Sequence, residues 1–125
     1  MPKTSKATAS DVTDIGILEE HSEELDGGYI ASFCRFREDG DATPVFRGLP
    51  DNRCQSPHWG YVFSGKITLK YADHDEVYEA GDAYYAPPGH LPLVTAGTEV
   101  VEFSPAHEYR MTQEAIARNM AGARA

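Results

Sequence analysis

Short runs in which apolar and polar residues alternate dominate the chain from residue 29 onward. Tyr29 to Arg37 alternates with a period of two, the pattern of a β-strand that buries one face. Further β-rich runs follow over 59–63, 67–71, 76–80, 83–86, 90–95 and 99–103, separated by Gly, Pro, Asp and Asn. Strands that recur roughly every eight to twelve residues with turn residues between them predict an all-β sandwich or barrel.

Two connections can be assigned from turn chemistry. Ser64-Gly65-Lys66 separates the runs 59–63 and 67–71, and a short glycine-containing turn between two β-rich runs predicts a β-hairpin. The segment 40–53 is rich in Asp, Gly, Pro and Asn, so we expect a long irregular connection there.

The two ends of the chain lack this alternation. Residues 1–10 are small and polar, which indicates a frayed arm before a single folded domain over 11–125. The segment 19–28 reads as an acidic loop that ends in two glycines. Near the other end, apolar residues at helical spacing predict a short helix over 112–120 with Thr112 as its N-cap.

Composition narrows the class of protein. A chain of 125 residues with 41% hydrophobic and 25% charged residues is typical of one soluble globular domain. The formal net charge of -9 argues against nucleic acid and anionic membrane surfaces as partners. No apolar run is long enough to span a bilayer, and the first residues lack a signal-peptide core, so we expect a cytoplasmic protein. In that reducing compartment, Cys34 and Cys54 should be free thiols or metal ligands.

Glycines and prolines between residues 52 and 92 carry a specific spacing. Gly65 ends a first segment, and a second segment then places Gly81, Pro87 and Gly89 in the order Gly-(X)5-Pro-X-Gly. These positions and the interval between them resemble the two sequence motifs of the cupin family, over roughly residues 29–104. The resemblance implies a small single-domain cupin, which is a double-stranded β-helix, or jelly-roll barrel, with its site between two antiparallel sheets.

The positions at which cupins carry metal ligands hold other residues here. Asn52 and Cys54 stand where the family has two histidines, and His58 stands where it has a glutamate. The family's last histidine falls on Pro92, but His90 lies two residues earlier and therefore on the same face of a strand. A thiolate and two imidazoles are good ligands for Zn(II) or Fe(II), so we expect Cys54, His58 and His90 to hold a divalent ion.

Strand parity predicts what surrounds this ion. If His58 points into the barrel, Gly60 and Val62 point inward as well and line a pocket. Gly60 has no side chain, so it should leave space beside His58 for a small organic molecule.

The alternate residues of the same strand should face outward. Three large aromatic groups on one exposed strand face exceed what a monomer usually leaves in water. We therefore expect a homodimer that covers the aromatic residues Trp59, Tyr61 and Phe63.

Three functions are consistent with these residues, because the cupin fold hosts many activities. The leading hypothesis is a metal-binding cupin with a small-molecule pocket, which could be a metal-dependent enzyme. A metal-free small-molecule binding or sensor module is the first alternative, in which Gly60, Val62, His58 and His90 line a pocket. The second alternative is a metal-free isomerase or lyase that uses His58 and His90 as acid and base.

Overall fold

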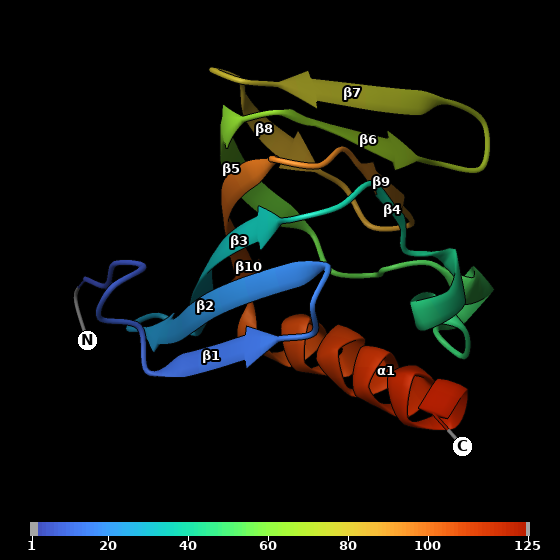
Figure 1. Ribbon diagram of the computed structural model, residues 1–125, viewed down its shortest axis with the longest axis horizontal. Helices are drawn as coiled ribbons and strands as arrows, with labels where there is room; N and C mark the ends of the chain where they lie inside the picture. The colour runs from blue at the N-terminus through green and yellow to red at the C-terminus, as the bar shows by residue number, and fades with distance from the viewer. Residues whose placement is uncertain (1–2, 125) are drawn as a thin grey trace.

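The computed structural model describes residues 3–124, which form two antiparallel sheets and one C-terminal helix (Figure 1). The larger sheet has the strand order β1-β2-β3-β10-β5-β8. Its strands are β1 (Asp11–Asp14), β2 (Leu18–Leu25), β3 (Tyr29–Phe36), β10 (Glu99–Pro105), β5 (His58–Ser64) and β8 (Ala83–Ala86). The smaller sheet has the order β4-β9-β6-β7, with strands β4 (Gly40–Asp41), β9 (Leu91–Val94), β6 (Lys66–Lys70) and β7 (Asp75–Glu79). The predicted all-β architecture is confirmed.

The connection at Gly65 is not the hairpin that the sequence predicted. β5 pairs with β10 and β8, whereas β6 pairs with β9 and β7, so the chain crosses from one sheet to the other between them. Gly65 has a φ of +80°, and a Cβ at this position would overlap Thr98. The turn therefore requires glycine, but glycine alone does not distinguish a hairpin from a corner between two sheets.

The segment predicted as an acidic loop is instead β2, an eight-residue strand that pairs with β1 and β3. Glu20 and Ser22 are its two buried residues, and both are polar. The strand pattern was missed because the buried face carries polar side chains, so no contrast between apolar and polar positions marks the alternation.

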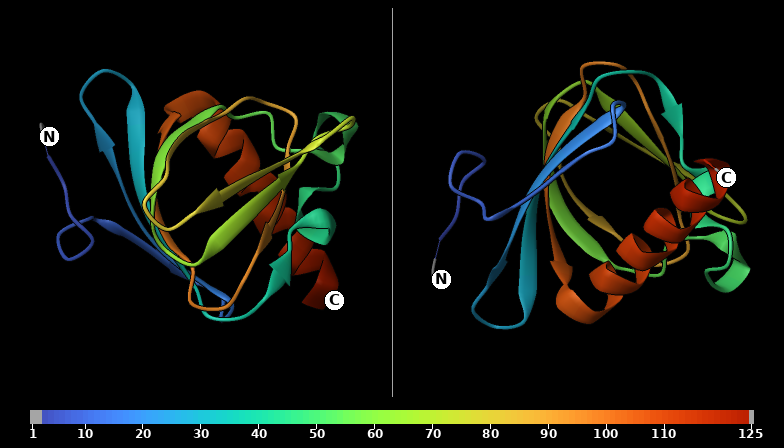
Figure 2. Two further views of the ribbon diagram at one scale, coloured as in Figure 1. Left: turned by 90° about the horizontal axis from the view of Figure 1, so that it is seen from above. Right: turned by 60° about the horizontal axis from the view of Figure 1, so that its bottom comes forward.

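The C-terminal helix is longer than the predicted 112–120. Helix α1 (Ala106–Arg124) starts directly after β10, so Thr112 lies inside the helix and is buried instead of capping its N-terminus. The helix lies across one side of the barrel (Figure 2). It contacts the 3-10 helix η1 (Thr43–Phe46), and Asn119 Nδ2 donates hydrogen bonds to the carbonyl oxygens of Val45 and Arg47 at 2.7 and 2.9 Å. Within residues 3–124, no helix has the length and apolarity required to cross a membrane.

The segment 40–53 is largely irregular, as predicted from its turn residues. It contains only the two-residue strand β4 and two short 3-10 helices, η1 and η2 (Pro50–Asn52). This segment carries the chain from the end of β3 to Cys54.

The N-terminal arm is described from Lys3 onward, so the first two residues of the predicted 1–10 segment lie outside the described part. Residues 5–8 form a turn in which the Ala9 N–H donates to the Ser5 carbonyl oxygen at 2.9 Å. Ser10 Oγ donates to Glu23 Oε2 on β2 at 2.7 Å. Fraying of this arm and the single-domain assignment stay predictions.

Buried apolar residues form two clusters. One lies between the sheets and comprises Cys34, Val62, Ile67, Leu69, Tyr84, Ala86, Val94 and Val100. The other lies under α1 and comprises Phe46, Leu49, Cys54 and Ala115. A cavity is lined by members of both clusters, so it lies where they meet.

Candidate metal site and cavity

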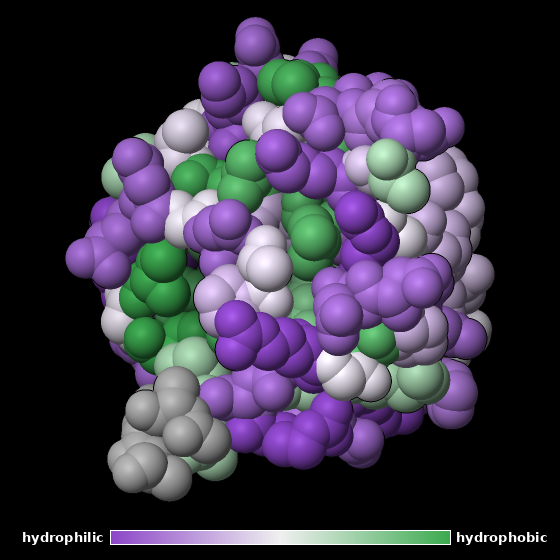
Figure 3. Space-filling view, turned by 90° about the vertical axis from the view of Figure 1, so that its right-hand side faces the viewer, coloured by the Kyte–Doolittle hydropathy of each residue, from purple (hydrophilic) through white to green (hydrophobic). Residues whose placement is uncertain are grey.

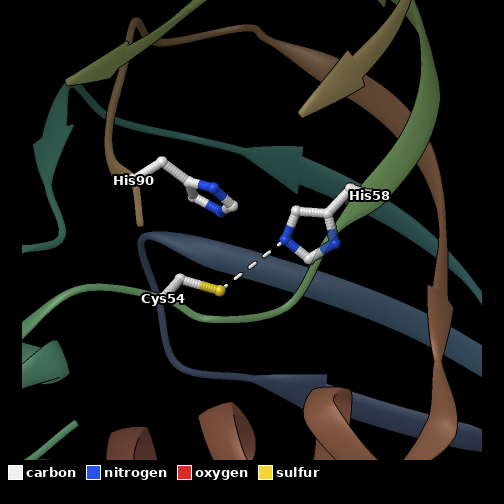
Figure 4. Close-up of side chains that lie close together, drawn as sticks. All are labelled: Cys54, His58 and His90. Atoms are coloured by element: carbon white, nitrogen blue, oxygen red, sulfur yellow. Dashed lines mark hydrogen bonds between the residues drawn. The ribbon is translucent and has the colours of Figure 1, made fainter. Parts of the chain in front are cut away.

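Cys54, His58 and His90 come together although they lie on three different segments (Figure 4). One potential ligand atom from each residue lies within 4.8 Å of the other two. Backbone hydrogen bonds join Cys54 to His90: the Cys54 N–H donates to the His90 carbonyl at 2.9 Å, and the Gly89 N–H donates to the Cys54 carbonyl at 2.8 Å. His58 is the first residue of β5. The expected convergence of these three residues is therefore present in the structure.

Hydrogen bonds orient both imidazole rings toward the cluster. His90 Nδ1 lies 2.9 Å from the Pro87 carbonyl oxygen, which can only accept, so this nitrogen carries the proton and Nε2 is free to bind a metal. His58 Nδ1 lies 2.7 Å from Ser104 Oγ, which likewise leaves Nε2 for the cluster. Such partners are typical of metal-binding histidines, because they fix the ring and its tautomer.

The spacing between sulfur and nitrogen fits a bound ion. Cys54 Sγ lies 3.7 Å from His58 Nε2. With Zn–S and Zn–N bonds of about 2.3 and 2.05 Å, a tetrahedral ion would separate the two atoms by about 3.6 Å. The pair can therefore accept an ion of this size without a change in backbone position.

Without a metal, the thiol and the imidazole of this pair stabilise each other's charged form. Burial by itself would raise the pKa of Cys54, but hydrogen bonds to His58 and His90 outweigh it and lower the pKa to about 5. Burial by itself would lower the pKa of His58, but the negative charge of Glu102 and the interaction with Cys54 raise it to about 9. The metal-free pair is thus a thiolate beside an imidazolium at neutral pH.

This pair should give the metal-free protein a bell-shaped contribution to stability. The contribution of Cys54 is complete above the ordinary thiol pKa of 9.0 and is lost as the pH falls through about 5. That of His58 is complete below 6.5 and is lost as the pH rises through about 9. Both groups are charged only between about pH 5 and about pH 9, and the thiolate loses its charged partner above this range. We therefore expect Cys54→Ser to lower the unfolding free energy most within this range, measured by urea titration of chelator-treated protein. A loss that does not vary with pH would contradict the ion pair.

A cavity of about 220 Å³ adjoins the three residues, all of which line it. Its walls are the inner face of the larger sheet, part of β9 and one side of α1. Most of the lining is apolar, including Ile17, Leu18, Phe36, Phe46, Val94 and Ile116. The polar side chains in the lining include Glu20, Ser32, Glu102, Ser104, Tyr109 and Thr112. An ion at the cluster would therefore face a mostly apolar cavity with a few polar groups, as in many small-molecule sites.

Glu20 is a cavity residue that the sequence did not identify. Its side chain is buried, with 5% of the residue exposed. Ser32 Oγ donates a short hydrogen bond to Glu20 Oε2, and Tyr109 of α1 donates to the same oxygen at 2.9 Å. Burial raises the pKa of Glu20 in spite of these two bonds. Glu20 and Ser22 lie two positions apart in β2 and therefore share a face. This spacing of two polar residues is the sequence signal that could have revealed Glu20.

Gly60 and Val62 do not line the cavity, contrary to the prediction from parity. Both face inward, but Tyr84 on β8 reaches across Gly60 and donates a hydrogen bond to Glu102 Oε2 at 2.5 Å. A Cβ on Gly60 would lie 2.5 Å from Tyr84 Cζ. The space beside this glycine is therefore filled by a tyrosine ring, and Val62 is fully buried in the apolar core.

Asn52 and Pro92 mark the two cupin ligand positions that do not join the cluster. Asn52 Oδ1 accepts a hydrogen bond from the Gly48 N–H at 3.0 Å and so closes its own loop. Pro92 lines the cavity on β9 but offers no donor atom for a metal. His90, two residues before position 92, instead lies within reach of Cys54.

Comparison with known proteins relates this architecture to solved structures. No family model matches the sequence, and no curated protein matches it. The structure is similar to an RmlC-like cupin from Shewanella frigidimarina NCIMB 400, with 21% identity, a TM-score of 0.53 and coverage of 77% of this chain and 84% of that chain. It is also similar to the polyketide cyclase RemF from Streptomyces resistomycificus, with 15% identity, a TM-score of 0.58 and coverage of 85% and 80%.

A third similar structure is FeII HppE, with 10% identity and a TM-score of 0.54. The match covers 81% of this chain and 58% of that chain. At these identities the comparisons establish the fold. With its two facing antiparallel sheets and these neighbours, the chain is a small cupin-fold domain.

Proposed function

We propose that this protein binds a divalent transition metal through Cys54, His58 and His90 and holds a small organic molecule beside it. The convergence of these three donors at one end of a cavity carries the proposal. Three protein ligands would leave at least one coordination position of the ion for water or substrate, and all three residues line the cavity. This arrangement supports a metal-dependent enzyme with Zn(II) or Fe(II). A cupin-fold neighbour is named with Fe(II), which supports the choice of ion.

Elemental analysis tests the metal directly. The protein should be purified without an affinity tag or chelator, then incubated separately with Zn(II) and with Fe(II) under anaerobic conditions and desalted. We expect about one equivalent of one ion per chain. Absence of stoichiometric metal after both incubations would overturn the proposal.

One observation favours metal-free acid-base chemistry as a second candidate. The raised pKa of His58 makes it a proton donor near neutral pH when no ion is bound, and Cys54 beside it is then a thiolate. Substrate turnover or isomerisation in protein shown to be metal-free would support this candidate, and loss of the same activity on chelation would contradict it.

We also propose that the protein is cytoplasmic and that it has no nucleic-acid or membrane partner. The net charge of -9 supports the second part, because phosphate groups would be repelled. Cys34 and Cys54 are both free thiols, which supports a reducing compartment.

An aromatic face on the outside of the larger sheet supports the proposed homodimer. Trp59, Tyr61 and Phe63 are exposed by 43, 41 and 54%. Tyr85 and Tyr29 extend the face, with ring centroids 5.0 and 6.0 Å from that of Trp59. By contrast, polar residues interrupt the apolar patches on the face shown in Figure 3.

Tyr61→Asp should dissociate this dimer. The change would place an unpaired charge in a buried apolar interface, which costs several kcal/mol. Sedimentation velocity on the wild type and the variant measures the result, and Val77→Asp on the other sheet, at a residue exposed by 49%, is the control. A wild-type monomer at high micromolar concentration would contradict the dimer.

A further inference from the structure

The charges that line the cavity are unbalanced. Among the described residues, its lining includes Glu20, Asp41 and Glu102 but no lysine or arginine. Outside the proposed metal site, therefore, no cationic side chain of the described residues faces a molecule that enters the cavity.

Glu20 and Glu102 each have one carboxyl oxygen that no protein group engages. The hydrogen bonds of Glu20 from Ser32, Cys34 and Tyr109 all end on Oε2. Tyr84 likewise binds Oε2 of Glu102. Within residues 3–124, no hydrogen bond ends on Oε1 of either glutamate, so these two atoms remain for a ligand.

We propose that the cavity selects neutral or cationic molecules that have an apolar body and a hydroxyl or amino group, and that it rejects anions. The donor group would bind Oε1 of Glu20 or Glu102, and the body would contact apolar residues such as Phe36 and Val94. A carboxylate or phosphate would face the carboxyl groups of Glu20, Asp41 and Glu102 with no free cation to offset its charge. The inference rests on the proposed small-molecule role of the cavity and specifies the class of ligand.

The volume of the cavity sets the size of a suitable probe. A cavity of about 150 Å³ accommodates benzene in another protein. The cavity here measures about 220 Å³, so it has room for one aromatic ring with a short substituent. Benzyl alcohol, benzylammonium and benzoate share this ring and differ mainly in charge and donor capacity, which makes them a matched series.

The test measures the affinities of these three probes for Cys54→Ser protein and for chelator-treated wild type. Elemental analysis should verify that each form is free of metal before the titration, because a bound ion could itself bind benzoate. Ligand-observed NMR titration should show binding of benzyl alcohol and benzylammonium, and at least tenfold weaker binding of benzoate. Benzoate that binds as tightly as benzyl alcohol in both forms would overturn the inference, as would failure of all three probes to bind.

Isosteric variants assign the selectivity to particular residues. Glu20→Gln and Glu102→Gln each remove one carboxylate, so each should reduce the preference for benzylammonium over benzoate by tenfold or more. Glu99→Gln is the control, because this side chain lies on β10 with 43% of its surface exposed and pairs with Lys6. If Glu20→Gln does not fold, Glu102→Gln still decides the outcome. A preference unchanged in Glu102→Gln and in any folded Glu20→Gln protein would overturn the assignment.

Discussion

Replacement of Cys54 by Ser, or of His58 or His90 by Ala, is expected to lower the affinity for Zn(II) or Fe(II) at least a hundredfold. Each change removes one of three donor atoms that lie within 4.8 Å of one another. Loss of a partner that only orients a metal ligand typically weakens binding by about 10- to 100-fold, so loss of a ligand itself should weaken it further. Competition against a chromophoric chelator measures the affinity, and circular dichroism verifies that the β-sheets remain.

Matched variants separate loss of a ligand from a general disturbance. Cys34→Ser removes the other thiol, and His107→Ala removes an imidazole whose side chain is 81% exposed, so both should retain full metal content. Ser104→Ala should have an intermediate effect, because Ser104 orients His58 through its hydrogen bond to Nδ1 at 2.7 Å. A Cys54→Ser protein that still holds one equivalent with wild-type affinity would show that the thiol is not a ligand.

The convergence of Cys54, His58 and His90 could be predicted from sequence because it depends on spacing. The glycines and prolines around these residues fix the turns, and parity predicts that His90 and Pro92 share a face; both line the cavity. Glu20 could not be predicted in this way. It lies on a strand whose buried face is polar, and its partner Tyr109 lies 89 residues away on a helix that was expected to begin only at residue 112.

The strands could be predicted from sequence, but their pairing could not. Alternation is a local property of a strand, so the runs around β3, β5 and β8 were visible in the sequence. Pairing depends on where distant strands lie. The turn at Gly65 has suitable hairpin chemistry, yet β5 and β6 belong to different sheets because each has better-placed partners elsewhere in the chain.

The prediction that Gly60 lines the pocket is wrong because strand parity gives the direction of a side chain but not what lies in front of it. Tyr84 fills that space on its way from β8 to Glu102 on β10. In the register of the sheet, Gly60 lies opposite both Tyr84 and Glu102, so it is the residue that the tyrosine must cross. The absence of a side chain at Gly60 thus allows Tyr84 to cross the strand and bind Glu102.

Gly60→Leu is therefore expected to destabilise the protein, although leucine is better suited to a strand than glycine. A Cβ would lie 2.5 Å from Tyr84 Cζ and 2.8 Å from the Val101 carbonyl oxygen. Overpacking of this kind typically costs about 1–3 kcal/mol, and the contact with backbone places the expected loss of unfolding free energy at the upper end. Urea titration measures the loss, and Tyr84→Phe, which keeps the ring but removes its bond to Glu102, shows the part due to that bond alone.

A double-mutant cycle between Gly60→Ala and Tyr84→Ala tests the cause. Removal of the tyrosine ring relieves the contacts with Cζ and the hydroxyl but leaves the Val101 carbonyl oxygen in place. Gly60→Ala should therefore destabilise the Tyr84→Ala protein less than the wild type, without becoming neutral, and the two changes should not be additive. Additive losses would show that the ring does not lie over Gly60. Glu102 would then have to be held in place by other contacts, and the space beside His58 would be open as the sequence had predicted.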